Sequence, residues 1–160
     1  MTVLETLNEA ELFAGLSEED CRAVTGLARR RNAAAGEELF RHGDPAKELY
    51  VIRRGRVELT FPLVVKGETK ETRFQSLEPG RTVAWSALVP PYRLTMGARG
   101  STDVELLAFE RAPLLALFER SPSVGYVVMA NLSRVVAARL NEVVSLWVRE
   151  IQRNVSHTYG

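Results

Sequence analysis

The chain has 160 residues, of which 46% are hydrophobic and 26% are charged, and its 21 basic and 20 acidic side chains leave a formal charge of +1. This length is that of one domain, large enough to bury a core without disulfides or metals. The near-neutral charge gives no electrostatic reason to expect a nucleic acid or an anionic membrane as partner. We therefore expect one domain over residues 1–160 that binds no nucleic acid by itself and no membrane.

The cysteine content and the distribution of apolar residues indicate in which cellular compartment the protein resides. Cys21 has no second cysteine to pair with, which favours a reducing compartment. The first residues, MTVLETLNEAELF, carry acids where a signal peptide needs an apolar segment, and no run of eighteen apolar residues occurs. The sequence predicts a cytoplasmic protein.

Residues 1–30 have helical periodicity in two parts. The leucine spacing in the first thirteen residues fits one helical stripe. Ser17 is a suitable N-cap for a second helix, because three acids follow it in the first turn. In this second helix we expect Cys21, Val24 and Leu27 to form the buried face.

Between residues 31 and 110, Gly and Pro separate short runs, a pattern typical of closely spaced strands. In RVELTF, residues 56–61, polar and apolar side chains alternate, which predicts a half-buried strand of an antiparallel sheet. We expect this strand to pair with ELYVIRR, residues 48–54, across a turn at Gly55.

Two further features support an antiparallel architecture. Lys66 and Gly67 predict the turn of another hairpin. In TDVELLAFER, Val104, Leu106 and Ala108 share one face of a late strand. Closely spaced strands with short turns favour a sandwich or barrel over a parallel sheet.

Residues 111–155 are again helical, with a short helix near residues 113–118 and a long one over about 122–153. Ser121 is the expected N-cap, because proline is favoured at the first helical position that follows. Polar Ser133 and Arg139 interrupt any strict heptad, so a long coiled coil is not expected. The apolar stripe consists of Val128, Leu132, Val136, Leu140, Val143, Trp147 and Ile151, with Val144, Leu146 and Val148 on other sides.

One face of a β-structure cannot cover so much apolar helix surface. We infer a second covering surface, most simply the same helix of another subunit in a two-fold homodimer. The alternative is a helix that bends back onto its own barrel.

The order of elements, with AAGEELFRHGDPAKELYVIRRGRVEL and LEPG among them, resembles the cyclic nucleotide-binding domain family over nearly the whole chain. The resemblance implies an eight-stranded antiparallel β-roll (jelly roll) like that of the cAMP receptor protein, flanked by N-terminal helices and a long C-terminal helix. It also implies a ligand pocket beneath the helix that follows the barrel. The residues that carry it are Gly36, Gly43–Asp44, Leu49–Tyr50, Gly55, Pro79–Gly80 and Asp103–Val104–Glu105.

In the family, a Gly-Glu pair follows the Pro-Gly turn and begins a short helix. The backbone N–H groups of this helix and an Arg later in the chain bind the cyclic phosphate. The Glu of the pair binds the ribose 2′-hydroxyl. Here the corresponding segment is VAWSALVPPYRLT. It has alanine at the Gly position and tryptophan at the Glu position, so the ribose carboxylate is missing, and its Arg lies one residue before the expected place. The candidate ligand-binding residues are Ala84, Trp85, Ser86, Ala87, Leu88, Arg93 and Thr95.

Two interpretations of this segment stay open. Trp85, Tyr92 and the prolines either close the pocket with packed apolar surface or form an aromatic platform for a flat ligand. Similarly, Arg93 either reaches a phosphate or is a solvated arginine. An occluded pocket or an altered ligand is favoured over ordinary cAMP binding, because a site that selects a hydroxyl loses discrimination without its hydrogen-bond partner. The candidate ligands are a cyclic nucleotide (cAMP or cGMP), another small anion, or none.

No motif favours catalysis or a metal site. Neither His42 nor His157 lies near Cys21 in the sequence, no Cys/His spacing is typical of a metal site, and no P-loop occurs. Many family members carry a helix-turn-helix after the long helix, where this chain has only SHTYG. The sequence predicts a stand-alone regulatory domain, not an enzyme, that signals through its C-terminal helix. The alternative is a ligand-free interaction module that recruits a protein partner.

Overall fold

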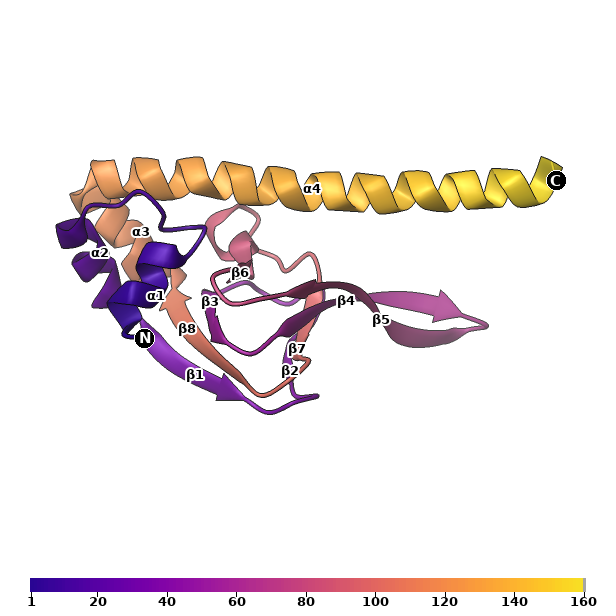
Figure 1. The fold of residues 1–160 in the computed structure, drawn as a ribbon, viewed down its shortest axis with the longest axis horizontal. Helices are drawn as coiled ribbons and strands as arrows, with labels where there is room; N and C mark the ends of the chain where they lie inside the picture. The colour runs from indigo at the N-terminus through magenta and orange to yellow at the C-terminus, as the bar shows by residue number, and fades with distance from the viewer. Residues whose placement is uncertain (160) are drawn as a thin grey trace.

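The computed structural model describes residues 1–159. Two short helices precede an eight-stranded antiparallel roll, and two helices follow it (Figure 1). The predicted fold class, mainly β with flanking helices, is confirmed. The elements are α1 (Val3–Glu9), α2 (Glu18–Thr25), β1 (Arg29–Ala33), β2 (Glu38–Phe40), β3 (Glu48–Arg54), β4 (Val57–Val65), β5 (Glu68–Leu77), β6 (Thr82–Val83), the 3₁₀ helix η1 (Trp85–Leu88), β7 (Gly97–Gly100), β8 (Val104–Glu110), α3 (Arg111–Arg120) and α4 (Pro122–Tyr159).

The strands form two four-stranded sheets, with the orders β1-β8-β3-β6 and β2-β7-β4-β5. The predicted pairing of residues 48–54 with 56–61 is therefore wrong, because β3 and β4 belong to different sheets. Residues 49–52 of β3 are all buried, so this strand is covered on both faces and pairs with β8 and β6. Gly55 lets the chain change sheets. Its φ is +82°, and a Cβ there would lie 2.1 Å from the Asp103 carbonyl oxygen, so only glycine fits.

The second predicted hairpin is confirmed. Val65 lies opposite Glu68, and Lys66 and Gly67 both have positive φ, as a two-residue turn of this kind requires. The β4–β5 hairpin extends away from the roll in the same direction as the C-terminal part of α4 (Figure 1).

Two apolar clusters form the core, and β8 contributes to both. Val104, Leu106 and Ala108 face the interior of the roll, which confirms their predicted common face. Leu107 and Phe109 point the other way, toward the helices. A strand stretch with two buried faces reads as a continuous apolar run, which explains the sequence LLAF at residues 106–109.

The second cluster joins the roll to α1, α2, α3 and the first half of α4. In α2 the predicted cap is confirmed, since the Ser17 Oγ accepts a hydrogen bond from the Asp20 N–H at 3.1 Å. Cys21 and Val24 are buried as expected, whereas Leu27 is only partly buried. These contacts fix the N-terminal helices against the base of α4.

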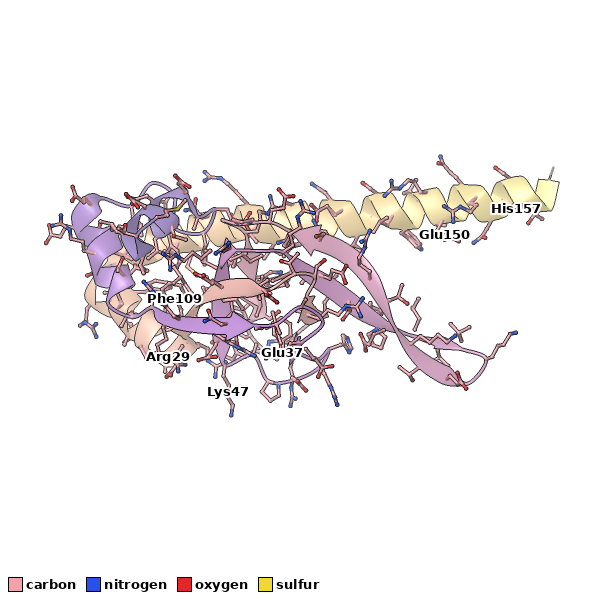
Figure 2. All side chains as sticks on the ribbon, turned by 60° about the horizontal axis from the view of Figure 1, so that its bottom comes forward. Arg29, Glu37, Lys47, Phe109, Glu150 and His157 are labelled. Atoms are coloured by element: carbon pink, nitrogen blue, oxygen red, sulfur yellow. The ribbon has the colours of Figure 1, made fainter. Side chains whose placement is uncertain are left out.

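Helix α4 is continuous over 38 residues, or about 57 Å, and extends past the predicted end at residue 153. It lies along the roll and then continues beyond it, so it does not bend back onto its own barrel (Figure 1). Glu150 and His157 lie on the extending part (Figure 2). No helix within residues 1–159 combines the length and the apolar character needed to cross a membrane.

Candidate functional site

A cavity of about 260 Å³ lies between the roll and α4. Strands β2, β4 and β6, the helix η1 and the segment before β7 form one wall, and one face of α4 forms the other. A single space is thus shared by the roll and the long helix. Its lining consists of Phe40, Leu59, Thr82, Val83, Ala84, Trp85, Ser86, Leu94, Thr95, Met96, Val136, Arg139, Leu140 and Val143.

The chain turns sharply from β6 into η1 at Ala84. This residue has φ 61° and ψ 40°, which is the left-handed conformation. Glycine adopts that conformation without steric cost, whereas an L-residue with a Cβ is strained in it. Ala84 therefore occupies a backbone position that suits the glycine that the family resemblance implies there.

The candidate residues from the sequence separate into two groups. Ala84, Trp85, Ser86 and Thr95 line the cavity. In contrast, Ala87 and Leu88 are buried in the core cluster beneath the helices and do not line it. A direct role in ligand binding stays a prediction for all of them.

Arg93 and Tyr92 lie outside the cavity lining. The Arg93 Nη1 donates a hydrogen bond to the Gly43 carbonyl oxygen at 3.2 Å. The Tyr92 ring lies against the Arg111 guanidinium, with 4.1 Å between the guanidinium carbon and the ring centroid. Trp85 and Tyr92 therefore do not form one aromatic platform, and only Trp85 adjoins the cavity.

Arg139 of α4 is the charged residue among the cavity-lining residues that the sequence analysis did not name as candidates. The residue is 5% exposed, and its Nη2 donates a hydrogen bond to the Thr82 carbonyl oxygen at 3.2 Å. Burial lowers the pKa of Arg139, an effect that nearby Glu11 opposes. A signal was present in the spacing, because position 139 lies three residues after Val136 and four before Val143, on the apolar face.

Glu11 connects three parts of the chain at this point. Its Oε1 accepts a hydrogen bond from the Thr82 N–H at 2.8 Å, and its Oε2 lies 3.2 Å from the Arg81 Nε. The same Oε1 lies 4.0 Å from the Arg139 Nη2. The segment after α1, the start of β6 and the middle of α4 are thus linked through one carboxylate.

Three other features of the described residues bear on metal binding and on nucleophilic chemistry. Within residues 1–159, no three His, Cys, Asp or Glu residues cluster as metal ligands would. Cys21 is a free, buried thiol, and burial raises its pKa, which disfavours the reactive thiolate. The His42 ring packs edge-on against Phe61.

Residues 30–121 match the model of the cyclic nucleotide-binding domain family, which is more than half of the chain. The chain belongs to this family. Its members are generally regulatory rather than catalytic.

Two solved structures are similar over most of the chain. One is a Geobacter metallireducens protein described as a cyclic nucleotide-binding protein, with 27% identity, a TM-score of 0.71, and coverage of 88% of this chain and 99% of that chain. The other is the Thermus thermophilus catabolite activator protein, with 29% identity, a TM-score of 0.73, and coverage of 89% of this chain and 63% of that one.

Among curated relatives, a Rhodopseudomonas palustris protein named as a potassium channel is 25% identical over 141 residues, which is 88% of this chain. The chain spans about a third of that relative, or 32% of its length.

Proposed function

We propose that this chain is a regulatory sensor domain that binds a nucleotide or another small anion in the cavity and signals through α4. The observation that carries the proposal is that one cavity has walls from both the roll and α4. A ligand that contacts both walls binds one position of the helix more tightly than another, and it therefore shifts the helix toward that position.

The family supports a cyclic nucleotide, cAMP or cGMP, as a candidate ligand. The cavity wall argues against ordinary cAMP selectivity, because no carboxylate lines it among the described residues. Trp85 takes the place at which the family resemblance implies a glutamate. A ribose 2′-hydroxyl would meet apolar surface there instead of an acceptor, so binding of cAMP would be weak or unselective.

A homodimer through α4 is part of this proposal. The second half of α4 extends beyond the roll, and Leu140 and Trp147 are 60% and 65% exposed. Contiguous apolar surface of this kind is typical of a protein interaction site. A second α4 would cover it, and a ligand-dependent shift of one helix would then be felt by the other subunit. The exposed residues are Leu140, Val143, Val144, Leu146, Trp147, Val148, Ile151 and Val155.

Two further parts of the proposal concern chemistry and location. The domain is not an enzyme, which the generally regulatory character of the family supports. A cytoplasmic location is supported by Cys21, which is a free thiol.

A second candidate function is a ligand-free interaction module that recruits a different protein. It is supported by the same exposed face of α4, because that face needs no ligand to be present. In contrast to the sensor function, this second function predicts that ligands leave the melting temperature and the position of α4 unchanged.

A thermal-shift panel with cAMP, cGMP, other nucleotides and small organic anions tests the proposal. A compound at 100 times its Kd adds about 2.7 kcal/mol to the free energy of unfolding. Hydrogen exchange on residues 136–159 with the active compound then tests signalling through α4. If no compound raises the melting temperature, the sensor function is wrong. If one does but exchange on α4 is unchanged, the signalling route is wrong.

A further inference from the structure

Arg139 is the last buried residue of α4 up to residue 158. Buried residues earlier in the helix, such as Val128 and Leu132, are mainly apolar and belong to the core cluster. None of residues 140–158 is buried. The point at which α4 leaves the roll is therefore fixed by a charged side chain and not by an apolar one.

The contacts of the Arg139 guanidinium are loose. Its Nη2 donates a hydrogen bond to the Thr82 carbonyl oxygen at 3.2 Å. Its Nη1 lies 3.6 Å from the Glu142 Oε2, and its Nη2 lies 4.0 Å from the Glu11 Oε1. Both carboxylate distances are too long for a hydrogen bond. Among residues 1–159, one hydrogen bond thus serves a group that has five N–H donors.

Unpaired polar atoms gather around this guanidinium. Within residues 1–159, the buried side-chain atoms without a hydrogen-bond partner include Arg81 Nε, Thr82 Oγ1, Arg139 Nη1 and Glu142 Oε2. We call these four residues, together with Glu11, the Arg139 junction. Buried polar groups without partners are rare, because they cost stability. Their concentration where α4 crosses β6 indicates that the observed position of the helix is poorly stabilised at this point.

The charges of the junction do not compensate for the burial of Arg139. Removing a cation from water is costly, and an ion pair offsets that cost only where its geometry is good and its other donors are satisfied. Glu11 is shared, and its Oε2 lies 3.2 Å from the Arg81 Nε. Burial lowers the pKa of Arg139, so the observed position disfavours the charged form of the side chain.

We infer, given the proposed signalling through α4, that Arg139 is a positioning residue that keeps the second half of the helix in balance between two positions. In the observed position the guanidinium is buried at Thr82. In the released position it is hydrated, and residues 140–158 no longer lie across the roll, while the core contacts of Val128 and Leu132 hold the first half. A ligand that contacts both walls of the cavity favours the observed position.

The first test replaces the buried cation with an apolar side chain of similar size. Because such replacements at buried ion pairs are often stabilising, Arg139→Met should hold α4 in the observed position. We expect about tenfold slower hydrogen exchange in residues 136–146 without any ligand, and a urea midpoint that is unchanged or higher. The matched control is Arg153→Met, which breaks the exposed pair with Glu150 on the same helix and should leave exchange in residues 136–146 unchanged.

The second test weakens the compensation of the charge. Glu11→Gln keeps an oxygen that can accept the Thr82 N–H and removes the carboxylate charge. We expect about threefold faster exchange in residues 136–146, with residues 124–132 unaffected. In the Arg139→Met protein the same substitution should have no effect on this exchange. A purely structural role of Glu11 would give the same change in both backgrounds.

Faster exchange or a lower urea midpoint in Arg139→Met would show an ordinary stabilising ion pair and would overturn the inference. If circular dichroism shows that this variant is unfolded, Glu11→Gln decides, and equal acceleration in residues 124–132 and 136–146 would overturn the inference. These measurements need no ligand. A negative thermal-shift panel with the expected exchange rates therefore refutes only the sensor function, and a positive panel with unchanged rates refutes only the role of Arg139.

Discussion

Both halves of α4 carry apolar side chains at helical spacing, but the two halves differ in their surroundings. In the first half, Val124, Val128 and Leu132 are buried against the roll and the N-terminal helices. In the second half, which begins at Leu140, both Leu140 and Trp147 are largely exposed. An apolar helical pattern thus indicates that a face will be covered, but not whether the same chain or another molecule covers it. The cavity lies where the two halves meet, around Val136 and Arg139.

The largest expected effect comes from deleting a core side chain in the first half. Leu132 is 3% exposed, so Leu132→Ala is expected to lower the free energy of unfolding by about 2–5 kcal/mol. The matched variant Leu140→Ala in the second half should change it by less than about 0.5 kcal/mol at concentrations where the protein is monomeric. Urea denaturation measures both. Equal losses in the two variants would contradict the contrast between the halves.

A smaller effect is expected at Asn131, which anchors the first half by hydrogen bonds. Its buried Nδ2 donates to the carbonyl oxygens of Leu12 and Ala14 at 3.0 and 2.8 Å. Asn131→Ala leaves these acceptors unpaired and should lower the free energy of unfolding by about 1–3 kcal/mol. As a control, Asn141→Ala removes an amide from the exposed side of α4. A loss at Asn131 no greater than that at Asn141 would show that the anchor does not stabilise the fold.

The smallest effect on the free energy of unfolding is expected for substitutions in the second half of α4. These substitutions should instead weaken the association of two chains into a dimer. Leu140→Glu combined with Trp147→Glu places two charges on the exposed apolar face. We expect the unfolding free energy of the monomer to change by less than about 1 kcal/mol, because both sites are solvated. Sedimentation should show a dimer for the natural sequence and a monomer for the variant. A monomeric natural chain at micromolar concentration would contradict the dimer proposal.

Much of the fold follows from local sequence signals. The Ser17 cap, the Lys66–Gly67 turn and the common face of Val104, Leu106 and Ala108 were all predictable, because each depends on residues close together in the chain. The pairing of β3 with β8 was not predictable in this way. Its partner, β8, lies more than fifty residues away, and two short strands beside a glycine do not reveal that the chain changes sheets between them.

The cavity was also predictable only in part, because its walls come from segments that lie far apart in the sequence. The family resemblance directed attention to residues 83–95, and Ala84, Trp85, Ser86 and Thr95 do line it. Arg139 and Thr82 were missed because the position of Arg139 on the apolar face of α4 is a local signal that does not show that α4 packs across β6. Arg93 appeared suitable from its position in the sequence, yet it donates its hydrogen bond to Gly43, outside the cavity lining.

The central claim is that ligand binding in the cavity is coupled to α4. Hydrogen exchange with and without a saturating concentration of the compound that most raises the melting temperature in the thermal-shift panel tests it most directly, with cAMP as a second ligand. We predict slower exchange both in residues 82–88 of the roll and in α4 around Arg139. Protection confined to the roll, with α4 exchanging at its unliganded rate, would contradict the coupling, and no protection in either region with either ligand would contradict the binding itself.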